Sequence, residues 1–341
     1  MSTFRTGDRV RIKPASEIAK TLDEHGRYES LPFMPEMLEF CGREFVVSAS
    51  AHKTCDTVNK TGGRSLPNTV HLANLRCSGA SHGGCDAYCL FFWKDVWLEP
   101  ASVPTATVAS AEYGQIAESL PTQHEVSAGV TKFSCQATEL PRYTKLLRWW
   151  DLRQYVKDVS SGNRSVSTVL KLGLLKWIQN RVEDGIAFYP FLKLYNALQA
   201  RLGGVPQVPD DGGPIAAGKR TPSLDLRLRP GEYVFVKSFE EIRETLDATG
   251  KNRGMRFDAE MKPYCGQRLQ VAKRVERIIN EKTGEMIQMK NPGIILEGGF
   301  CGSKFSKRRM FCPRALPGFW REIWLRRADE NAIPVVELTT Q

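Results

Sequence analysis

The sequence has no run of about 18 apolar residues, which is the length that a membrane-crossing helix requires. Its first residues, MSTFRTGDRV, also lack the apolar segment of a secretory signal. We therefore expect no membrane span and a cytoplasmic location. In that reducing compartment clustered cysteines are more often metal ligands or reactive groups than disulfides, and the odd count of nine fits a disulfide framework poorly.

The sequence is also poor in histidine, and it lacks the cysteine spacing of common zinc motifs. Its five histidines all lie before residue 125, and no two cysteines are separated by two residues. The sequence signal for a zinc site of the ribbon or finger type is therefore only moderate, because those sites use closely spaced cysteine pairs. The stretch 77–89 nevertheless holds three cysteines and a histidine within 13 residues.

Internal repetition is the strongest feature that is present. Residues 7–42 align without a gap with residues 231–266, and 14 of the 36 positions are identical. The segment FFWKDVWLEP (91–100) matches GFWREIWLRR (318–327). The two copies share cysteines in three pairs, which are Cys41 with Cys265, Cys77 with Cys301 and Cys85 with Cys312. Repeats of this kind predict two copies of one structural unit.

Each copy is expected to consist mainly of short strands. It opens with alternating apolar residues such as Val10 and Ile12, continues with one or two helical turns, and closes on paired tryptophans. In copy two, Asn291-Pro292 predicts a break between two strands, EMIQMK and GIILEG. Several short strands joined by glycine-rich turns favour a small closed or nearly closed barrel.

The opening GDRVRI and the closing DVWLEP resemble the first and last strands of SH3-like barrels. The C-terminal barrel of nitrile hydratase beta subunits is similar over about 15 residues of each copy, which is a likeness of fold and not of function. The resemblance implies a mainly β fold with a helical insert, comprising two SH3-like small β-barrels from an internal duplication. The two-copy pattern is also similar to uncharacterised bacterial proteins associated with natural-product gene clusters, which implies an accessory role in biosynthesis.

The domain boundaries follow from the repeat and from composition. We predict, in order, barrel repeat 1 with a Cys/His cluster (1–100), a linker (101–140), a helical insert (141–203), a second linker (204–230), barrel repeat 2 (231–328) and a tail (329–341). In the insert, Val169, Leu172, Leu175 and Ile178 share one helical face. That face is expected to bind a protein partner or a second copy of the chain, although a membrane surface is an alternative.

Copy one carries chemistry that copy two lacks. Its candidate zinc ligands are Cys41, His71, Cys77, His82, Cys85 and Cys89, because thiolate and imidazole are the ligands that zinc prefers. A closed set would be structural, whereas an open position would support chemistry on bound water or substrate. The alternative is that these cysteines are small core residues.

Two further groups of cysteines are candidates. His52, Cys55 and Asp56 are close enough in sequence to form a reactive thiol group. Cys265, Cys301 and Cys312 could form a second metal site, but copy two has no histidine, so a fourth ligand would come from elsewhere.

The positive charge is concentrated in copy two, which has 20 lysines and arginines against 12 acidic residues. The loop 302–314 interleaves aromatic residues with five candidate anion-binding residues, Lys304, Lys307, Arg308, Arg309 and Arg314. Such a pattern suits phosphate contact and base stacking, although a solvated loop gives it equally well. Three functions follow: a zinc-binding, non-catalytic accessory protein, a metalloenzyme that uses the cluster of copy one, or a nucleic-acid binder that uses copy two.

Overall fold

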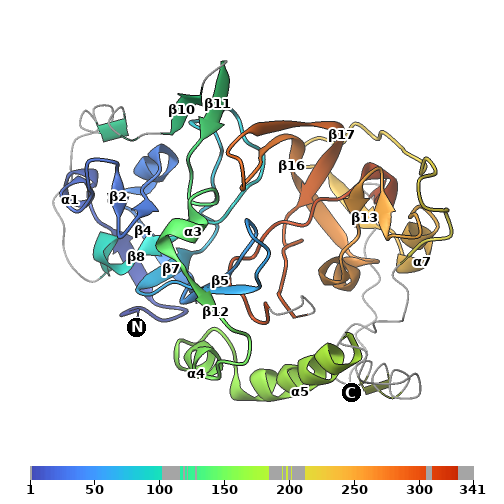
Figure 1. Ribbon diagram of the computed structural model, residues 1–341, viewed down its shortest axis with the longest axis horizontal. Helices are drawn as coiled ribbons and strands as arrows, with labels where there is room; N and C mark the ends of the chain where they lie inside the picture. Colours follow the sequence, from blue (N-terminus) through green and yellow to red (C-terminus); the bar gives the residue numbers. More distant parts are fainter. Residues whose placement is uncertain are drawn as a thin grey trace. The chain divides into compact units, whose positions relative to one another are not determined.

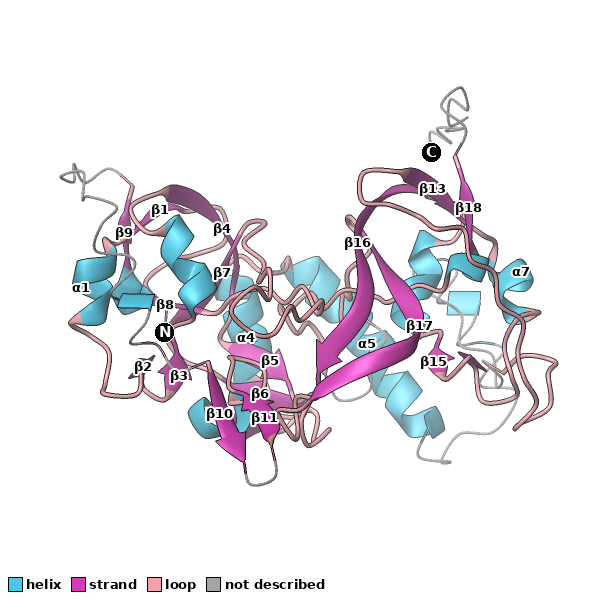
Figure 2. Ribbon diagram, turned by 90° about the horizontal axis from the view of Figure 1, so that it is seen from above, coloured by secondary structure: helices cyan, strands magenta, loops and turns pink. Residues whose placement is uncertain are grey.

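The computed structural model describes residues 2–101, 122–126, 129–183, 212–304 and 309–328, with a few isolated positions between 116 and 201 (Figure 1). The chain forms two compact units, and neither is continuous in sequence. Unit 1 comprises Met1–Gly204, Arg277–Gln288 and Gly302–Leu316, and unit 2 comprises Val205–Glu276, Met289–Cys301 and Pro317–Gln341. The expected mainly β fold is confirmed, and Figure 2 shows strands in both units.

A five-stranded sheet in unit 1 has the order β8-β7-β4-β1-β9. Its strands are β1 (Arg9–Ile12), β4 (Glu44–Ser50), β7 (Thr69–Leu72), β8 (Trp93–Lys94) and β9 (Leu98–Pro100). In β1, Val10 and Ile12 are buried and Arg9 is exposed, as the alternating sequence predicts. Strand β1 pairs antiparallel with both β4 and β9, so the first and last strands of the repeat lie side by side.

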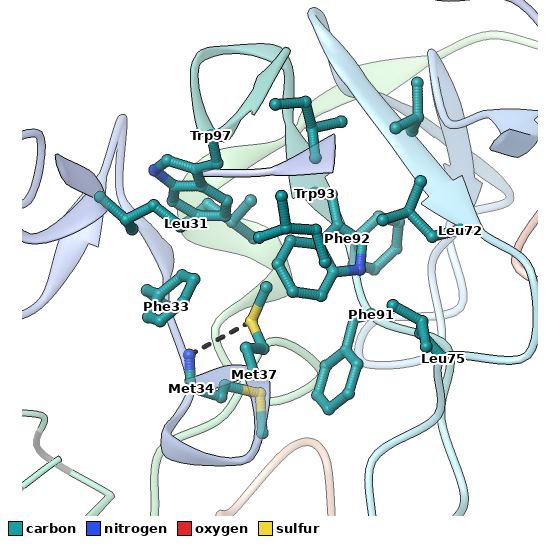
Figure 3. Packing of buried hydrophobic residues seen from close by; sticks show 14 of the residues in the cluster. Leu31, Phe33, Met34, Met37, Leu72, Leu75, Phe91, Phe92, Trp93 and Trp97 are labelled. Carbon is teal, nitrogen blue, oxygen red and sulfur yellow. Dashed lines mark hydrogen bonds between the residues drawn. The ribbon is translucent and has the colours of Figure 1, made fainter. Parts of the chain in front are cut away.

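Short elements cover this sheet and close its core. They are α1 (Ala15–Ala19), β2 (Arg27–Tyr28), β3 (Leu31–Pro32), and the 3-10 helices η1 (Pro35–Phe40) and η2 (Asp95–Trp97). Figure 3 shows Trp93, Trp97 and Phe33 packed together in the interior, with Met34 and Met37 from the start of η1 beside them. The ring centroids of Phe33 and Trp97 are 5.2 Å apart in an edge-to-face contact. This dense aromatic core fixes the position of η1.

The elements of unit 2 occur at nearly constant sequence offsets from those of unit 1. They are β13 (Tyr233–Val236), α7 (Phe239–Arg243), β14 (Lys251–Asn252), β15 (Met255–Arg256), η3 (Ala259–Tyr264), β16 (Arg268–Ile279), β17 (Met286–Leu296), η4 (Glu322–Trp324) and β18 (Leu325–Arg327). The sheet order is β17-β16-β13-β18. Arg9 pairs with Val46 in unit 1, and Tyr233 pairs with Gln270 in unit 2, which is an offset of 224 at both positions.

The strand break expected at Asn291-Pro292 does not occur. Strand β17 continues from Met286 to Leu296 through both residues and pairs with the long strand β16. The turn of this hairpin is closed by a hydrogen bond from Gly284 N to Asn280 O, 2.8 Å long, with Gly284 at φ 77°. The residues of the turn, Arg277–Gln288, belong to unit 1.

The segment between the repeats is only partly helical. Within its described residues, the helices include α3 (Leu140–Tyr143), α4 (Arg153–Ser160) and α5 (Val166–Glu183). Leu146 and Leu147, which fall within the helical insert expected at 141–203, lie instead on the strand β12 (Lys145–Leu147). This strand completes a three-stranded sheet, β12-β6-β5, with β6 (Gly63–Ser65) and β5 (Lys53–Cys55). Within the linker expected at 101–140, the chain forms the hairpin of β10 (Gln123–Val126) and β11 (Val130–Phe133).

None of the sheets in the described part of the chain closes into a barrel. The helices of that part include none long and apolar enough to cross a membrane. The tail, and most of the segment from 184 to 211, lie outside the described residues.

Candidate functional site

Three buried or half-buried side chains of different chemistry converge in unit 1. A ligand atom from each of Glu36, Cys77 and His82 lies within 4.8 Å of the other two. Glu36 is in the first turn of η1, while Cys77 and His82 belong to the loop between β7 and β8. Among the described residues, no other group of three or more His, Cys, Asp or Glu side chains meets this distance.

The loop holds His82 in place through a tight, glycine-rich turn. Backbone hydrogen bonds run from His82 N and Gly84 N to Gly79 O, each 3.0 Å long. Gly79 has φ 77°, and a Cβ atom built there would lie 2.0 Å from the carbonyl oxygen of Cys85. Only glycine fits that position, so the sequence HGG and the preceding Gly79 together determine where the imidazole lies.

Hydrogen bonds orient the ligand atoms. His82 Nδ1 lies 2.8 Å from Glu36 Oε1, which also accepts a 3.0 Å hydrogen bond from Ser81 N. His82 Nε2 lies 3.1 Å from the carbonyl oxygen of Ser134. The second carboxylate oxygen, Glu36 Oε2, is buried and has no hydrogen-bond partner. A buried, unpaired carboxylate oxygen is costly, and a bound cation would remove that cost.

Burial and neighbouring charges shift the pKa values of Glu36 and Cys77. Burial alone raises the pKa of Glu36, but the hydrogen bond and charge of His82 outweigh it and hold that pKa below its ordinary value. Burial raises the pKa of the Cys77 thiol, and the nearby Glu36 carboxylate raises it further. Without a cation, Cys77 is therefore a neutral thiol. A zinc ion would reverse this, because coordination deprotonates a thiol.

A small cavity adjoins two of the three residues, Cys77 and His82. It has a free volume of about 50 Å³ and is lined by four cysteines, Cys77, Cys85, Cys89 and Cys135, together with His82 and Arg314. The sulfur of Cys85 accepts a 3.4 Å hydrogen bond from Ile279 N, at the turn of the β16–β17 hairpin. The predicted residues Cys85 and Cys89 are thus neighbours of the three-residue group without joining it.

The two other predicted zinc ligands, Cys41 and His71, are core residues. Cys41 ends η1, and its sulfur lies 3.9 Å from Met37 O. His71 is fully buried on β7, and its Nδ1 lies 2.8 Å from the carbonyl oxygen of Phe91. Burial lowers the pKa of His71 to about 4, so the ring is neutral at physiological pH.

The predicted reactive group of His52, Cys55 and Asp56 does not assemble. Asp56 accepts hydrogen bonds from Asn59 N at 2.8 Å and from the Arg64 guanidinium at 3.1 Å. His52 Nε2 lies 3.3 Å from Asp158 Oδ1. Asp158 also forms a 2.6 Å ion pair with Lys53, and all three of these side chains are buried. Successive side chains of a strand point to opposite faces, so closeness in sequence around β5 does not bring His52, Cys55 and Asp56 together in space.

Cys55 instead contacts Cys312, a residue that the sequence assigned to a second metal site. The residues beside them are in contact, because Lys53 Nζ lies 5.7 Å from the Phe311 ring and Arg314 donates a 2.6 Å hydrogen bond to Thr57 Oγ1. Cys265 and Cys301, the other members of that predicted site, belong to unit 2, whereas Cys312 belongs to unit 1. These three cysteines do not form a metal-binding group.

In the basic loop 302–314 of copy two, Arg314 is buried, whereas an anion-binding residue is expected to be exposed. This residue is 1% exposed and forms a 3.2 Å ion pair with Glu281 and a 2.6 Å hydrogen bond to Thr57 Oγ1. Arg314 is therefore a buried structural cation and not a solvent-facing anion binder. Lys304 is exposed and Arg309 is half-buried, while Lys307 and Arg308 lie outside the described residues.

An apolar groove forms between α4 and α5. It has a volume of about 760 Å³, and none of its lining residues is charged. Its exposed members include Trp150, Leu152, Val156, Leu170 and Leu174, each more than half exposed. Exposed apolar surface gathered in one groove is typical of an interaction site.

Comparison with known proteins found no match to any family model, to any curated protein or to any solved structure. The function is therefore argued from the geometry of this chain alone.

Proposed function

We propose that this protein is a zinc-binding, non-catalytic accessory protein in which Glu36, Cys77 and His82 hold one ion. The observation that carries the proposal is the convergence of three different zinc-ligand types within 4.8 Å, in a group whose Glu36 carboxylate has one buried oxygen without a hydrogen-bond partner. The ion links η1 to the loop between β7 and β8. Its binding free energy then contributes directly to folding.

The cavity supports a structural ion over a catalytic one. Three protein ligands leave a fourth zinc position open, as in catalytic sites. However, substrate pockets usually measure about 300–1,000 Å³, whereas the adjoining space is about 50 Å³. That space has room for a water molecule as fourth ligand and not for an organic substrate.

Elemental analysis of the purified full chain tests the proposal. We expect about one zinc per chain, together with a lower melting temperature after chelation. Cys77→Ser, His82→Ala and Glu36→Gln should each lose zinc, because each removes one ligand. Cys301→Ser is the matched control, since Cys301 is the counterpart of Cys77 in the other repeat. Zinc-free wild-type protein with an unchanged melting temperature in chelator would refute the proposal.

The repeats themselves fit two copies of a small SH3-like unit. The support is the constant offset of 224 in the pairing of β1 with β4 and of β13 with β16. We propose an internal duplication, after which copy one alone acquired His82.

We propose the groove between α4 and α5 as the partner-binding part, with a second copy of the chain as its occupant. An uncharged groove lets two identical faces meet without like-charge repulsion, despite a net charge of +10. Native mass spectrometry should show a dimer that Leu152→Glu and Leu174→Glu convert to a monomer. Ile287→Glu, at an exposed apolar residue away from the groove, is the control and should remain dimeric. A monomeric wild type at high concentration would exclude this occupant.

A further inference from the structure

Cys55 and Cys312 form a thiol pair that the proposed zinc site does not use. Cys55 ends β5, and Cys312 lies in the segment Gly302–Leu316, so the pair joins parts of unit 1 that are far apart in sequence. Each residue is 4% exposed. The Lys53 ammonium lies 5.7 Å from the centre of the Phe311 ring, and Arg314 donates a 2.6 Å hydrogen bond to Thr57 Oγ1. These contacts on both sides of the two cysteines place Cys312 beside Cys55, and the Cys312 thiol acts on Cys55.

Positive charges surround the pair. The Arg314 and Arg309 guanidinium groups face Cys55, and the Lys53 ammonium faces Cys312. Arg314 Nε is buried and has no hydrogen-bond partner, although both terminal nitrogens of that side chain are paired. Glu281 is the acidic group that opposes these cations near Cys55. Cationic surroundings of this kind favour a thiolate over a thiol.

The electrostatic balance acts on Cys55 in particular. Its pKa is lowered to about 6, first by the hydrogen bond from Cys312 and then by Arg314 and Arg309, which together outweigh the opposing effect of burial. Three other cysteines of unit 1 behave in the opposite way. Burial raises the pKa of Cys41 to about 12, of Cys89 to about 12 and of Cys135 to about 11.

The backbone beside Cys312 is strained. Phe311 has φ 60°, a left-handed conformation that bulky residues rarely adopt. Its ring is held by an edge contact with Tyr155, with centroids 6.3 Å apart, and by the Lys53 ammonium at 5.7 Å. Strained residues persist only where surrounding contacts impose them, and they concentrate at functional sites. Here the contacts of the Phe311 ring hold the backbone next to Cys312 in one strained conformation.

We propose that Cys55 and Cys312 are a reversible dithiol–disulfide pair, oxidised by hydrogen peroxide. The Cys55 thiolate attacks one peroxide oxygen, so that an S–O bond forms, the O–O bond breaks and the departing oxygen leaves as water after taking a proton. The Cys312 sulfur then attacks the sulfenic acid on Cys55. An S–S bond forms, the S–O bond breaks, and the thiol proton of Cys312 leaves with the hydroxide as a second water.

Each turnover therefore oxidises two thiols by two electrons and reduces one peroxide to two waters. A dithiol reductant restores the pair. Because both sulfurs are buried, the oxidant must be small, and hydrogen peroxide is the appropriate reagent. The product is a covalent link between β5 and the segment Gly302–Leu316.

Peptide mapping of the full-length protein tests the pair. The folded chain is treated with a small molar excess of hydrogen peroxide, quenched, alkylated under denaturing conditions and digested. We expect a cross-linked peptide that joins Cys55 to Cys312, lighter by two hydrogens than the free peptides and absent after dithiothreitol. Oxidation that leaves both residues as free thiols, or that links either to other cysteines without preference, would overturn the proposal.

Variants assign the roles of the two sulfurs. Cys312→Ser should leave Cys55 as a sulfenic acid that dimedone traps, whereas Cys55→Ser should give neither the link nor a trapped Cys312. Cys41→Ser is the control, because Cys41 is a buried cysteine of the same unit outside the pair, and it should cross-link like the wild type. Zinc content is measured in parallel. A protein that forms the cross-link but contains no zinc refutes only the metal site. A protein that contains zinc but does not form the cross-link refutes only the thiol pair.

Discussion

At the scale of single residues, Glu36 shows what the sequence could and could not reveal. The comparison of the two repeats pointed to His82 because copy two has no histidine. The same comparison passed over Glu36, because it has a counterpart, Glu260, that is equally buried. A residue shared by both repeats can still acquire a new role in one of them, and only the spatial contact with His82 reveals it.

His71 predicts a specific loss of stability in acid. Its pKa is about 4 in the folded protein and near 6.5 when unfolded, so the unfolded chain binds a proton first as the pH falls. The stability of unit 1 should therefore decrease from about pH 6.5 down to about pH 4, by about 3 kcal/mol in total. Urea unfolding of wild type and His71→Gln at pH 7 and pH 4.5 measures it. An equal decrease in both proteins would contradict the assignment.

Cys55 predicts a reactivity that begins at unusually low pH. Its pKa of about 6 depends on Cys312, Arg314 and Arg309, with Glu281 opposing them. The rate of thiol loss at Cys55 with hydrogen peroxide should rise to half of its maximum near pH 6, whereas an ordinary thiol reaches that point about 3 pH units higher. Reactions that are quenched at timed intervals and analysed by mass spectrometry of the Cys55 peptide give this rate as a function of pH. A half-maximum above pH 8 would show that the cations do not act on this sulfur.

At the scale of helices and strands, the internal repeat predicted more of the structure than 14 identical positions in 36 suggest. Trp97 donates a 3.1 Å hydrogen bond to Thr21 Oγ1 in unit 1, and Trp324 donates a 2.9 Å hydrogen bond to Thr245 Oγ1 in unit 2. The sequence could not predict how far β17 extends, because local proline rules favoured a break that pairing with β16 overrides. Nor could it place β12, whose apolar pair fits a helix as well as a strand.

The turn that carries His82 depends on one glycine. Gly79→Ala should destabilise unit 1 strongly and lower its zinc content, because the added Cβ would lie 2.0 Å from the Cys85 carbonyl oxygen. Gly42→Ala is the matched control, since Gly42 has φ 75° but no atom within 4 Å of the added Cβ. That control should cost only about 1–2 kcal/mol of backbone strain. Thermal unfolding and zinc analysis of both variants make the comparison, and equal losses would exclude a special role for the turn.

At the scale of the whole molecule, the two units share the second repeat between them. Unit 1 includes Arg277–Gln288 and Gly302–Leu316, although both segments belong to the second repeat by sequence. The core and cavity of unit 1 are therefore incomplete without residues from the end of the chain, such as Arg314 and Ile279.

A fragment that ends at residue 204 should consequently be much less stable than unit 1 in the full chain. It lacks Glu281 and Arg314 and leaves Thr57 and Cys85 without their partners. We expect a melting temperature lower by 10 °C or more, or aggregation, since buried polar groups would lose hydrogen bonds. Calorimetry of the fragment and of the full chain provides the comparison. A fragment with native stability would mean that the added segments contribute little.

Because unit 1 includes two segments of the second repeat, recombination between genes is also constrained. A gene that encoded only the first repeat would lack Arg277–Gln288 and Gly302–Leu316 of unit 1, so recombination could not transplant that repeat to another protein as a complete unit. For the same reason, a protease that nicked the backbone between the repeats should release no free piece.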